Sequence, residues 1–319
     1  MTAVFVHGVP ETPAVWHGLL AALGRPDTVT LSLPGFDAAR PAGFGATMDE
    51  YAAWLAAQLE RLGDPVDLVG HDWGGGFVVR VVSTRPELVR SWVTDAAGVG
   101  DAGFEWHDFA KIWQTPQAGE DFWDQQLAAP AQERAGVFQM FGVPEQPARD
   151  LASHINPTMA ECILSLYRSA VDVAKQWGPD FAAIPAPGLV IIPGQDPFLS
   201  AASAAKAAAR AGAKTVALDG LGHWWMLQDP ARAATSTSLV PTPCRRSGPA
   251  TTVSSRNACP PPSQATLTNP ARSAPRRAHT QPRLCRCTWA VQSWSPGAWP
   301  KPSACKASIS ALAKPPRHW

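Results

Sequence analysis

Three short stretches of the sequence place a reactive side chain among glycines. The first is Gly70-His71-Asp72-Trp73-Gly74-Gly75, which directly follows the run Asp67-Leu68-Val69. Small residues around a central residue permit a sharp turn between a strand and a helix, which exposes the central side chain above the sheet. That side chain is Asp72, whose carboxylate can act as a nucleophile. The alternative interpretation is an aspartate that only caps the following helix.

The other two stretches supply an acid and a base. They are Gly194-Gln195-Asp196-Pro197 and Gly220-Leu221-Gly222-His223, and each follows an apolar run. Alone, either stretch is compatible with an ordinary turn. Together, the order of nucleophile, acid and histidine at the ends of successive strands is typical of a hydrolase triad. The pattern predicts that His223, paired with Asp196, activates a water that cleaves an ester formed on Asp72.

The segments that must position these residues alternate between strand and helix. Helices are expected from Thr12 to about Gly24 and after the capping box Thr47-x-x-Glu50. Apolar runs predict strands at residues 3–6, 28–33, 66–69, 91–94, 188–192 and 215–218. Strands that are apolar throughout and are separated by helices predict an α/β fold, with a mainly parallel sheet covered on both faces.

Residues 98–185 interrupt this alternation with mostly helical patterns. A capping box at Thr158-x-x-Glu161 predicts a helix over residues 158–177, and Tyr167 lies on its apolar face. Such an insertion would sit above the carboxyl ends of the strands, where open parallel sheets hold their sites. We therefore expect a core at residues 1–97 and 186–234 and a helical cap at residues 98–185.

The composition changes abruptly after residue 234. All 26 acidic residues lie before residue 230, so residues 1–234 carry a net charge of −11, whereas residues 235–319 carry +12. This basic tail, rich in proline and serine, contains 14 of the 32 prolines and five of the six cysteines. Charge of one sign and little periodic apolar sequence predict a disordered tail. A second hypothesis is that the tail is translated in a shifted reading frame.

Up to about residue 234 the chain resembles the α/β-hydrolase superfamily. Besides the three stretches above, it has His7-Gly8-Val9-Pro10, which is similar to the oxyanion loop of the family. The resemblance implies that the backbone N–H groups of Val9 and Trp73 form the oxyanion hole. It also implies a sheet of about six strands, because two strands that usually precede this loop in the family are missing.

An aspartate at the nucleophile position resembles the epoxide hydrolases and haloalkane dehalogenases of this superfamily. Epoxide hydrolases donate a proton from two cap tyrosines, and Leu166-Tyr167-Arg168 resembles the motif of the second one. The resemblance places Phe109 at the position of the first tyrosine, so Tyr167 is the expected proton donor. We expect His7, Phe109 and Trp113 to line the substrate pocket. The alternative for Tyr167 is a tyrosine that only packs in the core.

Two other functions stay open. A haloalkane dehalogenase needs N–H donors for the departing halide; Trp73 suits this role, and the cap tryptophans Trp106, Trp113 and Trp123 are available as partners. The other function is a catalytically dead hydrolase scaffold that acts as a binding protein. The filled triad positions favour an enzyme, and the Tyr167 motif favours the epoxide hydrolase over the dehalogenase.

The remaining expectations concern ligands and location. We expect a small hydrophobic substrate, no cofactor, no metal and no nucleic-acid or membrane partner. The glycines at 74–76 are not followed by the lysine of a phosphate-binding loop. The first residues read as a strand and not as a signal peptide, so we expect a cytoplasmic protein.

Overall fold

A six-stranded parallel sheet organises the chain, in the order β2-β1-β3-β4-β5-β6. The computed structural model describes residues 1–238, so the expectations about residues 239–319 of the tail lie outside the described residues. The predicted start of the tail at residue 235 is corrected, because residues 235–237 are helical. The strands are β1 (Ala3–Val6), β2 (Thr28–Leu31), β3 (Val66–Gly70), β4 (Val89–Thr94), β5 (Gly188–Pro193) and β6 (Lys214–Leu218). The predicted α/β fold with six parallel strands is confirmed.

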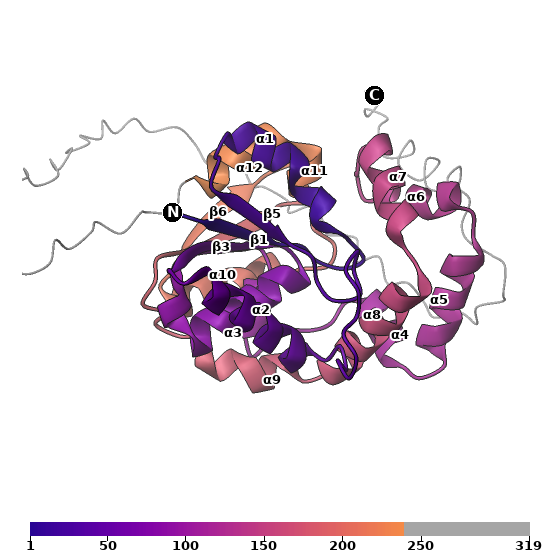
Figure 1. Cartoon of the computed structure of the whole chain (residues 1–319), viewed down its shortest axis with the longest axis horizontal. Coiled ribbons are helices and arrows are strands. Elements are labelled where there is room, and N and C mark those ends of the chain that lie inside the picture. Colours follow the sequence, from indigo (N-terminus) through magenta and orange to yellow (C-terminus); the bar gives the residue numbers. More distant parts are fainter. Residues whose placement is uncertain (239–319) are drawn as a thin grey trace, which may run out of the picture. The chain divides into compact units, whose positions relative to one another are not determined.

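Helices cover both faces of this sheet (Figure 1). On one side lie α1 (His17–Leu23), α11 (Trp225–Gln228) and α12 (Pro230–Thr237); on the other lie α2 (Met48–Leu62), α3 (Trp73–Thr84) and α10 (Ala201–Ala211). β1 is buried at every position, because a central strand covered by two helical layers meets no water on either side. The capping box of Thr47 and Glu50 begins α2 as predicted.

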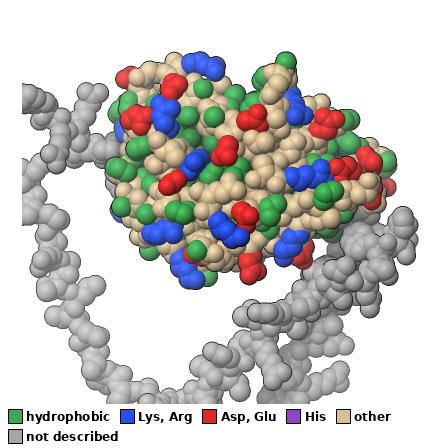
Figure 2. Space-filling view, turned by 90° about the horizontal axis from the view of Figure 1, so that it is seen from below, with side chains coloured by type: hydrophobic (Ala, Val, Ile, Leu, Met, Phe, Trp, Pro, Cys, Tyr) green, Lys and Arg blue, Asp and Glu red, His purple; other side chains and the backbone are tan. Residues whose placement is uncertain are grey.

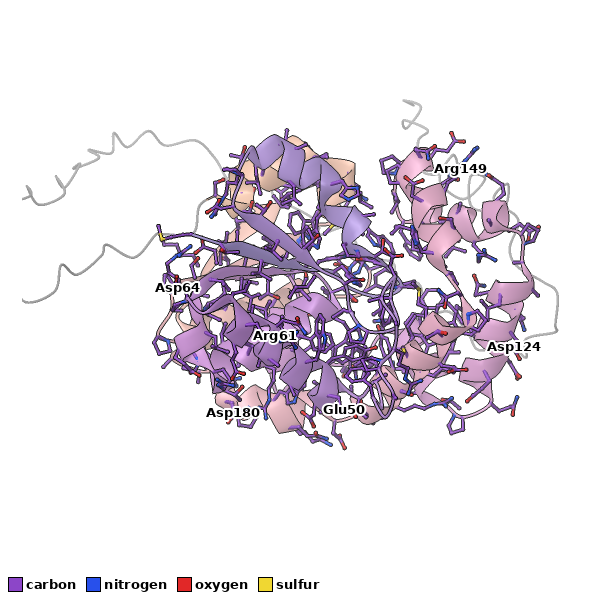
Figure 3. The ribbon with its side chains drawn as sticks, viewed as in Figure 1. Glu50, Arg61, Asp64, Asp124, Arg149 and Asp180 are labelled. Atoms are coloured by element: carbon purple, nitrogen blue, oxygen red, sulfur yellow. The ribbon has the colours of Figure 1, made fainter. Side chains whose placement is uncertain are left out.

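Six α-helices lie between β4 and β5 in the chain. They are α4 (Asp108–Gln114), α5 (Ala118–Ala128), α6 (Ala131–Met140), α7 (Glu145–His154), α8 (Pro157–Ser169) and α9 (Val173–Trp177). Charged side chains such as Asp124 on α5 and Arg149 on α7 point outward from this group (Figure 3). Its buried side chains are largely apolar and aromatic. The boundaries of a separate cap at residues 98–185 stay a prediction.

The helix predicted over residues 158–177 differs in detail from α8 and α9. Asn156 and not Thr158 caps α8, because its side chain accepts a hydrogen bond from the Met159 N–H and Pro157 takes the first helical position. The helix ends at Ser169, and α9 begins only at Val173. Tyr167 still lies on the buried face of α8, as the apolar pattern predicted.

The segment after His223 is likewise divided into two short helices. Asp229 ends α11 and caps α12, accepting a hydrogen bond from the Arg232 N–H. Among the described residues, no helix has the length and apolar character to cross a membrane. Acidic and basic side chains are interspersed on the face shown in Figure 2.

Candidate active site

Asp72 lies at a sharp turn between β3 and α3. Its backbone adopts φ 50° and ψ −122°, which is unusual for a residue with a side chain. The flanking glycines make the turn possible: a Cβ on Gly74 would lie 2.2 Å from the Val6 carbonyl oxygen, and a Cβ on Gly70 would lie 2.4 Å from the Gly74 oxygen. The strained position raises the Asp72 side chain above the end of the sheet.

The loop after β1 brings a backbone donor to this carboxylate. The Val9 N–H donates to Asp72 Oδ1 at 2.9 Å. This approach requires glycine at position 8, because a Cβ there would lie 2.4 Å from the Asp72 Cβ. Trp73 is the first residue of α3, and the first N–H groups of a helix have no partner within the helix. The structure thus brings both predicted oxyanion donors next to Asp72.

His223 and Asp196 form a hydrogen-bonded pair beside the carboxylate. The His223 Nδ1–H donates to Asp196 Oδ2 at 2.9 Å, and Nε2 lies 3.7 Å from Asp72 Oδ2. Asp196 is held in turn by the backbone N–H groups of Phe198 and Leu199. With its proton on Nδ1, the neutral His223 ring presents an acceptor nitrogen toward Asp72. The geometry is suited to removing a proton from a water beside that carboxylate.

Burial and neighbouring charges determine the pKa values of Asp72 and His223. Burial raises the pKa of Asp72 to about 6, an effect that the positive charges of His223 and His71 oppose. Burial tends to lower the pKa of His223, but the Asp196 carboxylate outweighs it, so this pKa lies above its usual value. Near neutral pH, Asp72 is therefore mostly a carboxylate.

These pKa values predict the pH dependence of any reaction in which Asp72 attacks a substrate and forms an ester. Only the Asp72 carboxylate can attack, so the rate of ester formation should fall about tenfold per pH unit below about pH 6. The positive charge of His223 lowers the pKa of Asp72, so in His223→Gln the fall in the rate of ester formation should begin at a higher pH. Rapid-quench measurements of ester formation between pH 4.5 and 8 check both statements. If the rate of ester formation fell at the same pH in the variant and in the wild type, the effect of the His223 charge on the pKa of Asp72 would be contradicted.

A small cavity opens at Asp72 and His223. Its volume is about 80 Å³, and its walls are mainly aromatic and aliphatic. The lining includes Val9, Asp72, His107, Phe109, Trp113, Phe122, Trp123, Gln126, Arg134, Phe138, Phe141, Tyr167, Phe198, His223 and Trp224. Several of these residues come from the helices between β4 and β5, so that segment forms one wall of the site.

Tyr167 reaches the same cavity from α8. Its ring packs edge-on against Trp73 and Trp113, at centroid distances of 5.5 Å and 4.8 Å. Burial raises the pKa of Tyr167 well above its usual value, and the charge of Asp72 adds to the rise. The neighbouring Trp73 side chain acts in the opposite direction. The Tyr167 phenol is therefore protonated, and it lies close enough to Asp72 for the carboxylate charge to affect its pKa.

Of the three residues expected in the substrate pocket, the structure brings two to the cavity. Phe109 and Trp113 line it, whereas His7 does not. The His7 ring is fully buried, with Nδ1 bonded to the Gly8 oxygen and Nε2 accepting from the Leu33 N–H. Burial lowers the pKa of His7 to about 4. This ring holds the oxyanion loop in place, and the expectation that it contacts substrate is corrected.

Beneath Asp72 lies a buried charged network that the sequence patterns do not predict. His71 lies between two carboxylates, with Nδ1 2.5 Å from Asp95 Oδ2 and Nε2 3.1 Å from Glu11 Oε1. Burial tends to lower the pKa of His71, but the two carboxylates outweigh it and raise this pKa well above its usual value. The indole N–H groups of Trp224 and Trp225 donate to Glu11 and Asp95 respectively.

This network fixes the backbone around Asp72. Asp95 Oδ1 accepts from the Asp72 N–H at 2.9 Å, and Glu11 Oε2 accepts from the Gly8 N–H at 3.1 Å. Glu11, His71 and His223 also place ligand atoms within 4.8 Å of one another, but Glu11 and His71 already bind each other and are fully buried. We therefore interpret the group as a support for the turn and the oxyanion loop.

Comparisons with known proteins agree with this architecture. Over 89 residues the chain is 34% identical to lipase LipV of Mycobacterium tuberculosis, which covers 28% of this chain. The chain thus spans only about a third of that relative, 34% of its length.

Solved structures are similar in fold. Haloalkane dehalogenase DbeA from Bradyrhizobium elkani has a TM-score of 0.58 at 20% identity, with 74% of this chain and 89% of that chain covered. Epoxide hydrolase VrEH1 from Vigna radiata has a TM-score of 0.61 at 18% identity, with 74% of this chain and 89% of that chain covered. Epoxide hydrolase A from Mycobacterium thermoresistibile has a TM-score of 0.58 at 19% identity, with 73% of this chain and 89% of that chain covered. A model of the alpha/beta hydrolase family matches residues 3–235. The chain therefore belongs to the alpha/beta hydrolase family.

Proposed function

We propose that the protein is an epoxide hydrolase that works through a covalent ester on Asp72. The observation that carries this proposal is the position of Tyr167 at the cavity that also contains Asp72 and His223. A nucleophile, a base and a neutral proton donor then surround one small space. The mainly apolar and aromatic lining supports a small hydrophobic substrate.

The reaction proceeds in two steps. In the first, an Asp72 oxygen attacks an epoxide carbon, the carbon–oxygen bond breaks, and the freed oxygen takes the proton of Tyr167. In the second, His223 removes a proton from water, and the resulting hydroxide attacks the ester carbonyl of Asp72. The N–H groups of Val9 and Trp73 stabilise the oxyanion, and such donors contribute about 3–4 kcal/mol each in serine hydrolases.

The last proton transfers regenerate the enzyme. His223 returns its proton to the diol oxygen that leaves the tetrahedral intermediate. The attacking water leaves its remaining proton on the Asp72 carboxyl, and this proton restores the Tyr167 phenol. The sum of the steps is an epoxide plus water giving a diol, with no external acid or oxidant.

The surroundings of Trp73 favour the epoxide over a haloalkane. The Trp73 ring lies edge-on to the Tyr167 ring, and Trp73 is not among the residues that line the cavity. An indole N–H can only donate, so Trp73 does not compete for the Tyr167 proton, which stays available to a substrate oxygen. A dehalogenase would instead need this N–H to face the halide.

One observation favours haloalkane dehalogenase as the second candidate. The indole N–H groups of Trp113 and Trp123 have no hydrogen-bond partner among the described residues, and both side chains line the cavity. Unpaired buried donors cost free energy that a bound anion would recover. A departing halide needs such donors and no proton.

A panel of small epoxides and haloalkanes separates these candidates. We expect diol formation from at least one epoxide, measured by chromatography, and little halide release from the matched haloalkanes. Halide release without diol would assign the protein to the second candidate. The absence of both products, and of any covalent adduct, would support a binding protein on an inactive scaffold.

A further inference from the structure

We propose that His107 is a second hydrogen-bond donor to the substrate oxygen, so that its Nε2–H and the Tyr167 phenol together hold the oxygen released from the epoxide. This inference rests on the proposed epoxide hydrolase function. It assigns a catalytic role to a residue that the triad and the tyrosine motif leave without one.

The N-terminus of α4 determines which nitrogen of His107 carries the proton. His107 is the N-cap of this helix, and its Nδ1 accepts a hydrogen bond from the Ala110 N–H at 3.2 Å. An accepting Nδ1 has no hydrogen, so the neutral ring must carry its proton on Nε2. The cap thus fixes the tautomer that donates from the outer edge of the ring.

The ring borders the reaction space. His107 lines the cavity together with Asp72, Tyr167 and His223. Its centroid lies 6.2 Å from that of Tyr167 and 5.1 Å from that of Phe198, which in turn packs edge-on against His223 at 5.0 Å. No hydrogen bond joins Nε2 to another described side chain or backbone group, so its N–H is available to a substrate.

The ring also stays neutral under working conditions. Burial lowers the pKa of His107 to about 4, and the positive charge of His223 adds to this effect. Three further charged groups act on the ring: Asp196 and Asp108 raise its pKa, and Lys111 lowers it. A neutral imidazole N–H donates a hydrogen bond without losing its proton. His107 therefore stabilises the developing alkoxide, and Tyr167 supplies the proton.

A second hydrogen-bond donor to the substrate oxygen would compensate for the weak acidity of Tyr167. Burial and the Asp72 charge make Tyr167 a weaker acid than an ordinary tyrosine. Phe109, which also lines the cavity, offers no hydroxyl. His107 precedes Phe109 by two residues on the same wall. When the epoxide carbon–oxygen bond breaks, its electron pair stays on oxygen, which then accepts from the His107 N–H while it takes the Tyr167 proton.

The experiment separates the donor from the helix cap. His107→Asn keeps a side-chain oxygen that caps α4 but loses the outer N–H, whereas His107→Ala loses both. We expect both variants to slow ester formation from an epoxide by about 10²-fold, the loss typical of one oxyanion donor. Hydrolysis of the preformed ester should stay within a few-fold, and only His107→Ala should lower the melting temperature appreciably. Rapid quench with the epoxide that gives most diol measures both steps.

Three results would contradict the donor role of His107. Wild-type rates of ester formation in His107→Asn, with a loss only in His107→Ala, would show that the histidine is only a cap. An equal slowing of ester formation and ester hydrolysis in His107→Asn would also overturn the donor role. Diol formation by the wild type in these cases leaves the proposed function intact. A wild type that forms neither diol nor adduct overturns both.

Discussion

Asp72→Asn is expected to abolish turnover, by about 10⁴-fold or more, as removal of a nucleophile does in other hydrolases. A neutral amide is a poor nucleophile at an epoxide carbon, and His223 would then have no ester to cleave. The substitution preserves the side-chain volume and the Val9 N–H contact to Oδ1. Steady-state diol formation with the best epoxide measures the loss, and circular dichroism checks the fold.

Asp124→Asn is the matched control for this change. Asp124 is an exposed aspartate on α5, and its side chain points away from the molecule (Figure 3). The same chemical change at this position should leave turnover within about twofold, because surface substitutions far from a site usually have little effect on the stability of the fold. Turnover above one tenth of wild type in a folded Asp72→Asn protein would exclude Asp72 as the nucleophile.

Tyr167→Phe should lower epoxide turnover by at least about 100-fold, the low end of general-acid contributions. The ring stays packed between Trp73 and Trp113, and only the hydroxyl is lost. Any haloalkane turnover should change by no more than a few-fold, because a halide departs without a proton. Parallel assays of diol and halide on one preparation measure both effects.

Tyr51→Phe is the control, since Tyr51 is the other tyrosine in the chain. Its hydroxyl donates to the Pro34 oxygen at 2.7 Å inside the core and does not line the cavity. Losing that hydrogen bond should cost roughly 1 kcal/mol of stability and little activity. Equal losses on epoxides and haloalkanes in Tyr167→Phe would mean that Tyr167 is a packing residue. Full epoxide activity would remove it from the mechanism.

Local sequence signals were sufficient to predict the sheet and to place Asp72, Asp196 and His223 at the ends of its strands. Apolar runs such as Ala3–Val6 are buried on both faces, so burial shows directly in the residue types. The glycines around Asp72 indicate a tight turn, and the contacts at Gly70 and Gly74 explain why no side chain fits there. Because parallel strands share one carboxyl edge, residues at their ends come together once the topology is known.

Features that depend on contacts between distant residues were not predictable in the same way. His71 immediately precedes Asp72, and Glu11 follows the loop His7-Gly8-Val9-Pro10, but nothing local shows that the side chains of His71 and Glu11 meet beneath Asp72. His7 was expected at the substrate pocket because of its motif, yet its ring turns into the core. At α8, two adjacent capping signals competed, and the proline after Asn156 favours the earlier one.

The measurement that tests the covalent mechanism most directly is the intact mass of the His223→Gln protein after exposure to an epoxide. Asp72 should still open the epoxide, but the ester should persist because no base activates the water. We predict a mass increase equal to one substrate molecule, on the peptide that contains Asp72, and one burst of reaction without turnover. An active wild type combined with no adduct on the variant would contradict the two-step mechanism.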